Sequence, residues 1–329
     1  MAVRAPEFWA QPGLVPTLLA PLATLYAVGA AARTMFASPF RAPVPVLCIG
    51  NLVAGGAGKT PIVLSLAELL RRQGRHPHIV SRGYGGRLAG PVAVDPAGHR
   101  AADVGDEPLL LARTAPCWIA RDRVAGAKAA VAAGADLVLL DDGFQNPSLA
   151  KDLSFVVVDG AYGFGNRQVM PAGPLREPIE VGLARADAVV IIGADERRAE
   201  AAVAGRLPVL HATLAPRGAE DLAGRKVLAF AGIGRPAKFY ATLAGLGARI
   251  VARHDFPDHH RYRDVEITQL TGAAEAQGAV AVTTAKDWVR LPEALRGAIR
   301  VLEIAVEWRE PDQLTALLAT KLPSPPADD

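Results

Sequence analysis

Cysteine is scarce in this chain of 329 residues, and so is any motif that would use it. The two cysteines, Cys48 and Cys117, lie far apart, and each stands in an apolar run. Such a pair provides neither a disulfide framework nor the spacing of a metal-binding cluster. We therefore expect buried free thiols and a reducing, cytoplasmic compartment.

The chain also lacks a large excess of charge of either sign. A formal net charge of +3 does not by itself indicate a nucleic-acid partner, and an anionic membrane surface or a phosphorylated substrate suits it equally. Half of the residues are hydrophobic and 21% are charged, which excludes global disorder and allows a large core. The length fits one large domain or two modest ones.

Charge is missing altogether between Phe8 and Ala32. The segment is long enough to span a bilayer, which takes about 20 apolar residues. Pro12, Pro16 and Pro21 weaken a spanning helix, and a cleaved signal peptide does not fit the nucleotide-binding pattern that follows soon afterwards. We expect an uncleaved helix that lies on or dips into the membrane, with a true span or an ordinary packing helix as alternatives.

Apolar strand patterns alternate with helical patterns along the first two-thirds of the chain. Strands are expected at 44–51, 76–86, 91–95, 116–120, 135–145, 153–160 and 186–193, and helices at 60–74, 105–115 and 121–134. This alternation predicts right-handed crossovers and a mostly parallel, doubly wound α/β sheet covered on both faces. A second, smaller unit repeats the β-α-β rhythm, and no internal repeat of fixed period is present. The expected divisions are an N-terminal helix in 1–40, a core in 41–215, a smaller α/β unit in 216–310 and a tail in 311–329.

A phosphate-binding loop is indicated by the string GNLVAGGAGKTP at 50–61, between an expected strand and an expected helix. The common pattern is G-x-x-x-x-G-K-[ST], and Val53 stands at its first glycine position. Glycines inside the loop let backbone N–H groups turn toward phosphate oxygens, and the helix dipole attracts the anion. We expect Lys59 to contact the β- and γ-phosphates and the Thr60 hydroxyl to bind Mg²⁺. The residues expected to bind the nucleotide are Val53, Ala54, Gly55, Gly56, Ala57, Gly58, Lys59 and Thr60.

Acidic residues follow another buried strand, as a phosphate-binding loop requires for its metal. The string LVLLDDGFQ places Asp141 and Asp142 at the end of that strand, where they are expected to position Mg²⁺. The N-K-x-D motif with which GTPases recognise guanine is absent, and the string TAKD at 284–287 resembles it only weakly.

Further polar strings occur at the expected strand ends, namely SRGYGG, GDE, DDGFQ, PAGPLREP and DFPDHH. Together with GN-x4-GG-x-GKTP, they resemble one family closely, the tetraacyldisaccharide 4'-kinases of lipid A biosynthesis, from the apolar N-terminal segment to about residue 291. The resemblance implies a P-loop core, a smaller α/β/α subdomain and a short strand-built linker. It departs after DDGFQ, where a histidine is usual and this chain has Asn146, to which we assign no catalytic role.

The activity implied by the resemblance is transfer of the γ-phosphate of ATP, with Mg²⁺, to the 4'-hydroxyl of a tetraacylated glucosamine disaccharide 1-phosphate. The implied partners are this lipid and the inner-membrane surface at its cytoplasmic face, with no nucleic acid and no obligate protein partner. Because acyl chains leave a bilayer at a cost of about 0.8 kcal/mol per CH₂, the enzyme must come to the membrane. The uncharged segment, followed by Arg33 and Arg41, suits that requirement.

The resemblance also implies roles for individual residues. Asp106 matches the family's proposed catalytic aspartate, and His259 matches the histidine paired with it, so that with Lys59 they are the expected catalytic residues. Glu107 is expected to help position the metal, although an acid at a helix start often only favours the dipole. The residues expected to line the substrate cleft are Tyr84, Arg121, Asn166 and Arg176.

Two other classes of protein stay open on the sequence alone. A membrane-associated P-loop switch would hydrolyse a nucleotide to control a partner, but it would leave the acid and histidine cluster unexplained. A soluble kinase or ligase for a small metabolite would leave the apolar N-terminal segment unexplained. We also expect the two lobes to close on ATP and so exclude water.

Overall fold

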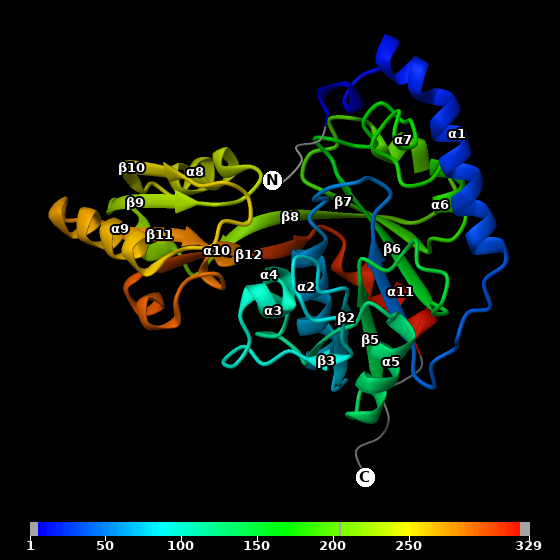
Figure 1. Ribbon diagram of the computed structural model, residues 1–329, viewed down its shortest axis with the longest axis horizontal. Coiled ribbons are helices and arrows are strands. Elements are labelled where there is room, and N and C mark those ends of the chain that lie inside the picture. The colour runs from blue at the N-terminus through cyan, green and yellow to red at the C-terminus, as the bar shows by residue number, and fades with distance from the viewer. Residues whose placement is uncertain (1–5, 204, 323–329) are drawn as a thin grey trace.

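A continuous mixed sheet runs through both lobes of the molecule (Figure 1). The computed structural model describes residues 6–203 and 205–322, and within them the twelve strands follow the order β10-β9-β11-β12-β8-β7-β6-β1-β5-β2-β4-β3. Residues 1–5 of the expected N-terminal region and 323–329 of the expected tail lie outside the described residues. Only β8–β12 and β3–β4 pair in antiparallel fashion among the described strands, so the expected mostly parallel α/β sheet is confirmed.

The first lobe holds the strands around β1. Its strands are β1 (Val46–Gly50), β2 (Pro77–Ser81), β3 (Val92–Ala93), β4 (Cys117–Ile119), β5 (Leu137–Asp141), β6 (Leu153–Asp159) and β7 (Ala188–Ile192). Its helices are α2 (Lys59–Arg72), α3 (Ala101–Val104), α4 (Asp106–Leu111), α5 (Arg123–Ala132), α6 (Ile179–Leu183) and α7 (Ala199–Val203). β1 lies between β5 and β6 and is buried along its whole length, because helices cover both faces of the sheet.

The second lobe is a smaller α/β unit built in the same way. It contains η2 (Glu220–Leu222), β9 (Lys226–Ala231), α8 (Pro236–Gly245), β10 (Arg249–Asp255), α9 (Asp264–Ala276), β11 (Val280–Thr284), α10 (Ala285–Trp288) and η3 (Glu293–Ala298). Phe239 and Leu243 of α8 pack on one face of its strands, whereas Ile267 and Leu270 of α9 pack on the other. The sheet of this lobe is therefore sandwiched between helices, as the sequence predicts.

Two long antiparallel strands, β8 (Val209–Arg217) and β12 (Arg300–Trp308), join the lobes. In Figure 1 they run as neighbouring ribbons from the first lobe to the second. The pairing Leu214↔Val306 lies midway along them, and Trp308 Nε1 donates to Ser65 Oγ of α2 over 2.9 Å. The chain therefore leaves and re-enters the first lobe at the same place.

The segment 311–329 is not simply a tail. Residues Pro311–Lys321 form helix α11, and its buried Leu314 and Leu318 belong to the same apolar core as α2 and α4 of the first lobe. The expectation of a tail overlooked this helix because the prolines and acidic residues that follow it dominate the composition of the last residues.

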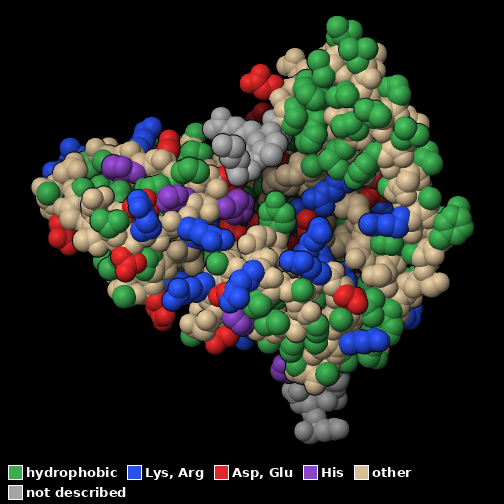
Figure 2. Space-filling model, viewed as in Figure 1, with side chains coloured by type: hydrophobic (Ala, Val, Ile, Leu, Met, Phe, Trp, Pro, Cys, Tyr) green, Lys and Arg blue, Asp and Glu red, His purple; other side chains and the backbone are tan. Residues whose placement is uncertain are grey.

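The N-terminal segment is η1 (Glu7–Trp9) followed by α1 (Leu14–Met35) along the flank of the first lobe (Figure 1). Among the described residues, α1 is the one helix whose length and mean hydropathy of 1.7 would allow it to cross a membrane, and 11% of its apolar window is buried in the protein. Leu18 and Leu25 are about 70% exposed. Hydrophobic side chains cover this edge of the molecule in Figure 2, which does not fit an ordinary packing helix.

Candidate active site

The loop between β1 and α2 has the backbone of a phosphate cradle. It leaves the sheet after Gly50 and enters the helix at Lys59, so that the N-terminus of α2 points toward the loop. Gly58 has φ +82°, and a Cβ atom at this position would lie 2.6 Å from Cδ1 of Ile192. Glycine adopts this positive φ without a steric cost and leaves room for the end of the Ile192 side chain, so it suits the turn at the start of α2.

Lys59 is held over this loop by polar side chains of the first lobe. Its Nζ donates to Asn51 Oδ1 over 3.1 Å and lies 3.6 Å from Asp142 Oδ1. Asn51 is fully buried, and its backbone carbonyl accepts a hydrogen bond from Gln145 at 2.9 Å. Asn51 and Asp142 thus fix the ammonium group beside the loop.

The two aspartates after β5 have different surroundings. Asp141 is buried and accepts a hydrogen bond from Ser81 Oγ at 3.0 Å, and burial together with the charge of Glu107 raises its pKa to about 7. Asp142 stands at φ +50° and forms a bidentate ion pair with Arg176, with distances of 2.8 and 3.3 Å. Arg176 is expected to line the substrate cleft, and in the structure its guanidinium pairs with Asp142, which is expected to bind Mg²⁺.

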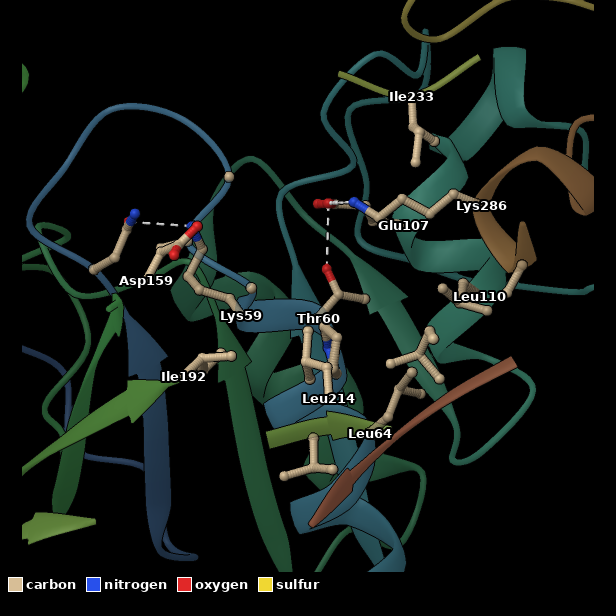
Figure 3. A pocket seen from close by; sticks show the side chains of 18 of the residues that line it. Lys59, Thr60, Leu64, Glu107, Leu110, Asp159, Ile192, Leu214, Ile233 and Lys286 are labelled. Atoms are coloured by element: carbon tan, nitrogen blue, oxygen red, sulfur yellow. Dashed lines mark hydrogen bonds and ion pairs between the residues drawn. The ribbon is translucent and has the colours of Figure 1, made fainter. Parts of the chain in front are cut away.

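Thr60 and Glu107 meet at one side of the loop, as Figure 3 shows. Thr60 Oγ1 donates to Glu107 Oε1 over 3.2 Å, and Lys286 of the second lobe donates to the same oxygen over 2.6 Å. Within the described residues, no group of three His, Cys, Asp or Glu side chains forms a metal cluster. Mg²⁺ in kinases needs only one or two carboxylates besides the phosphates, so the oxygen donors present fit this ion.

Asp106 and His259 come together across the two lobes. Asp106 opens α4 after Gly105, whose φ of +93° would press a Cβ atom to 2.5 Å from the Tyr84 carbonyl oxygen. Asp106 Oδ2 lies 3.0 Å from His259 Nδ1 and 3.1 Å from Arg290 Nε. The expected catalytic pair is therefore in direct contact.

The charges of this pair follow from its partners. Burial by itself would raise the pKa of Asp106, but the His259 hydrogen bond and the Arg290 charge bring it down to about 2. The hydrogen bond to Asp106 raises the pKa of His259. His259 also has φ +60°, a backbone conformation that costs about 1–3 kcal/mol and is concentrated at functional sites.

The cleft between the lobes has a volume of about 2670 Å³ and is lined by both. Figure 2 shows Lys and Arg side chains gathered over this hollowed middle of the molecule. Tyr84, which is 75% exposed, and Arg121 both line the cleft. The P-loop, both aspartates after β5 and the Asp106–His259 pair line it too, so that most of the expected site residues share one cavity.

Asn166 is not brought to this cleft. Its amide donates to the carbonyl oxygens of Phe8 and Ala172 over 3.1 and 3.0 Å, and its Oδ1 accepts from Gln168. It lies outside the residues that line the cleft. These hydrogen bonds give Asn166 a structural role, in which it fastens η1 to the first lobe, and its expected substrate contact stays a prediction.

Several polar residues of the site were missed by sequence reasoning. Asn51 accepts a hydrogen bond from Lys59, and Gln145 donates to the Asn51 carbonyl oxygen. Arg123 is a buried guanidinium beside Asp141 that donates to Ala120 O over 2.7 Å. Burial lowers the pKa of Arg123. Their only sequence signal is their place at strand ends, next to the motif residues.

A strand, a glycine-rich loop, Gly-Lys-Thr, a helix and two acids at a neighbouring strand end define a P-loop protein that binds a nucleoside triphosphate. The family model described as tetraacyldisaccharide-1-P 4'-kinase matches residues 15–323. A tetraacyldisaccharide 4'-kinase of Rhodospirillum centenum is 57% identical over 327 residues, which cover 97% of each chain. One from Rhodospirillum rubrum is 54% identical over 321 residues, which cover 96% of this chain and 97% of that protein.

Among solved structures, LpxK from Aquifex aeolicus, an "apo" form in complex with ATP, superposes with a TM-score of 0.80 at 28% identity. The match covers 94% of this chain and all of that one. This chain belongs to the tetraacyldisaccharide-1-P 4'-kinase family and is a kinase. The switch protein and the soluble-metabolite enzyme left open by the sequence are not favoured.

Proposed function

We propose that this kinase uses ATP and Mg²⁺ to phosphorylate the 4'-hydroxyl of a tetraacylated glucosamine disaccharide 1-phosphate at the cytoplasmic face of the inner membrane. The observation that carries the proposal is the contact of Asp106 with His259, 3.0 Å across a cleft that also holds the P-loop. Such a pair, placed to orient a hydroxyl group and take up its proton, suits an enzyme with an alcohol acceptor.

In this reaction the 4'-hydroxyl oxygen attacks the γ-phosphorus, the bond from that phosphorus to the bridging oxygen breaks, and ADP leaves. The N–H groups of residues 53–60 bind the phosphates, and Lys59 neutralises charge on the transferred group. Thr60, Glu107, Asp141 and Asp142 are the oxygen donors that would hold Mg²⁺, which supplies positive charge to the phosphate oxygens when bound.

The proton of the attacking hydroxyl is delivered to the Asp106–His259 pair. Asp106 is ionised at neutral pH, so it orients the hydroxyl and accepts its hydrogen bond. A carboxylate with a pKa of about 2 retains a proton poorly, whereas His259 has a raised pKa. Because Nδ1–H of His259 donates to the ionised Asp106, the free lone pair of the neutral imidazole is on Nε2, and the proton comes to rest there.

Helix α1 attaches the enzyme to the membrane in this proposal. Its exposed apolar face is continuous, and Arg33 in its last turn suits anionic lipid headgroups. The Arg33 guanidinium also donates to the carbonyl oxygen of Gln145 over 2.9 Å, which connects the end of α1 to the P-loop region. The cleft is thereby held near the surface where the acyl chains remain.

Mass spectrometry of the lipid after incubation with Mg-ATP tests the proposal directly. The unaltered protein should add one phosphate to the acylated disaccharide 1-phosphate. Lys59→Ala should lower kcat by about 100-fold or more, since one lost transition-state contact costs roughly 10²–10³. The matched control is Lys128→Ala, an exposed lysine of α5 outside the cleft, which should react normally. ATP hydrolysis that does not depend on the lipid would contradict the proposal.

A further inference from the structure

Arg290 is a buried cation at the boundary between the lobes. It follows α10 of the second lobe, and its side chain is 3% exposed. Its Nε donates to Asp106 Oδ2 over 3.1 Å, and its Nη1 donates to the Gly232 carbonyl oxygen over 2.8 Å and to Asp287 Oδ1 over 3.2 Å. Nη2 lies 3.1 Å from the same Asp106 oxygen without hydrogen-bond geometry.

The guanidinium is fixed from behind by a second buried group. Asp287 is fully buried and accepts hydrogen bonds from the backbone N–H of Gly232 at 2.9 Å and from Tyr262 at 2.8 Å. Its other oxygen accepts from Thr284 Oγ1 at 2.6 Å. Because every partner of Arg290 on this side is itself held in the second lobe, the guanidinium is a rigid part of that lobe.

His259 binds the same oxygen of Asp106 but is held less firmly. Its side chain is 46% exposed, and it stands on a loop at φ +60°. Arg290 and His259 together occupy Oδ2, whereas in the described structure Oδ1 accepts only the adjacent N–H of Glu107, at 3.0 Å. Oδ1 is therefore the Asp106 oxygen with capacity left for an incoming hydroxyl.

We propose that Arg290 is a positioning residue for the transfer reaction: it fixes Asp106 from the second lobe so that Oδ1 faces the acceptor hydroxyl. This inference rests on the proposed function. Arg290 acts through Asp106 and makes no contact with the reacting atoms itself. Through this contact, the orientation of the Asp106 carboxylate in the first lobe depends on the position of the second lobe.

An arginine is required because its planar fork holds acceptors on two sides at once. Nε faces Asp106, while Nη1 faces Gly232 O and Asp287. A lysine ammonium is a point charge on a flexible stem, so it can pair with Asp106 or with Asp287 but does not hold both in a fixed plane. Arg290→Lys thus keeps the charge and removes the positioning.

The experiment compares steady-state lipid phosphorylation by Arg290→Met, Arg290→Lys and a control, Arg296→Met. Arg296 stands on the same segment and donates to two backbone carbonyl oxygens, but it does not touch Asp106. Transfer by the unaltered protein is measured first and tests the proposed function alone. For Arg290→Met, kcat should fall by about 100-fold, as a misplaced catalytic group predicts, with an almost unchanged KM for ATP. Arg296→Met should keep its kcat.

Rescue separates positioning from a merely structural role. Millimolar guanidinium should restore part of the kcat of Arg290→Ala, whose short side chain leaves room for the ion, and have no effect on the unaltered protein. Titration of bound nucleotide gives the fraction of competent enzyme. The kcat of Arg290→Met is then calculated per competent enzyme. If it stays within about threefold of the unaltered value, the expected loss from a misplaced Asp106 is absent and the inference is overturned. If Arg290→Met does not fold, Arg290→Lys is the variant that tests the inference. A full kcat in Arg290→Lys would show that the planar guanidinium is not required.

Discussion

Lys286 of the second lobe lies 2.6 Å from Glu107 of the first, on the oxygen that also accepts the Thr60 hydroxyl (Figure 3). Burial alone would lower the pKa of Lys286, but the neighbouring Glu107 raises it, so the ammonium is charged at neutral pH. A protein cation therefore binds at the oxygen donors that we propose for Mg²⁺. The ion and the lysine must compete for Glu107.

Lys286→Met should lower the Mg²⁺ concentration that half-saturates nucleotide binding. The pair is partly exposed, so its contribution is about 1 kcal/mol at most, or roughly fivefold. Fluorescence of a bound ATP analogue, titrated with Mg²⁺, measures the change without any turnover. The matched control is Lys238→Met, another lysine that spans the lobes, 3.7 Å from Asp159. An unchanged or higher Mg²⁺ requirement in Lys286→Met would show that the two do not compete.

The rate of lipid phosphorylation should rise with pH through the pKa of His259. This pKa lies above the ordinary 6.5 because of the hydrogen bond to Asp106, and only the neutral imidazole accepts the proton. The acidic limb of the kcat/KM profile should therefore lie above pH 6.5 in the unaltered protein. His259→Ala should lower the rate and abolish this limb. A profile identical to that of the unaltered protein would exclude His259 as the proton acceptor.

The stability that the His259–Asp106 contact contributes should fall as the pH rises, whereas the reaction rate should increase. Because the folded-state pKa of His259 is raised, its stabilising effect is fully present below about pH 6.5 and is lost as pH rises through the folded-state value. We expect the difference in unfolding free energy between the unaltered protein and His259→Ala to be larger at pH 6 than at pH 9. Urea unfolding at the two pH values measures it, and an equal difference would refute the coupling.

Charge on the exposed face of α1 should release the protein from membranes. Leu18→Asp combined with Leu25→Asp replaces two side chains that are 70% and 69% exposed, and each apolar contact with lipid is worth about 1.5–3 kcal/mol. Sedimentation with anionic vesicles should show binding at least about tenfold weaker. Val265→Asp on α9, which replaces an exposed apolar residue of the second lobe, is the control. Undiminished sedimentation of the double variant would argue against α1 as the anchor.

Helix α11 should be essential to the first lobe. Leu318→Ala removes a side chain that is 2% exposed in the main core, and such truncations cost about 2–5 kcal/mol. Denaturant unfolding should show this loss, whereas Gln313→Ala on the exposed face of α11 should change little. An equal effect of the two substitutions would mean that α11 is not packed as described.

The sequence predicts the parts of the site that each lie within one local motif. The P-loop, the acids after β5 and the start of α4 are strings in which a strand end, a glycine and a polar residue stand together. Their local geometry is set by neighbouring residues, so the strings suffice. The parallel order of strands follows from the same alternation of elements.

Contacts between the lobes could not be derived in this way. Asp106 and His259 are 153 positions apart, and Asp106 and Arg290 are 184 apart. Their meeting depends on how β8 and β12 set one lobe against the other, which no local pattern encodes. The resemblance to the family supplied His259 but not Arg290. Asn166 lies outside these strings and was named only from the resemblance, and the contact that the structure gives it, a hydrogen bond to the Phe8 carbonyl oxygen beside η1, has no local sequence signal either.

The return of the chain from the second lobe has a consequence for biosynthesis. The first lobe completes its core only with β12 and α11, which emerge from the ribosome after the whole second lobe has been translated. Domains of nascent chains generally fold as units from the N-terminal end. Here the first lobe begins to be synthesised first, but the second lobe is complete before it. Until α11 is made, the first-lobe core lacks Leu314 and Leu318, so a polypeptide stalled before residue 311 exposes apolar surface of the kind that chaperones bind.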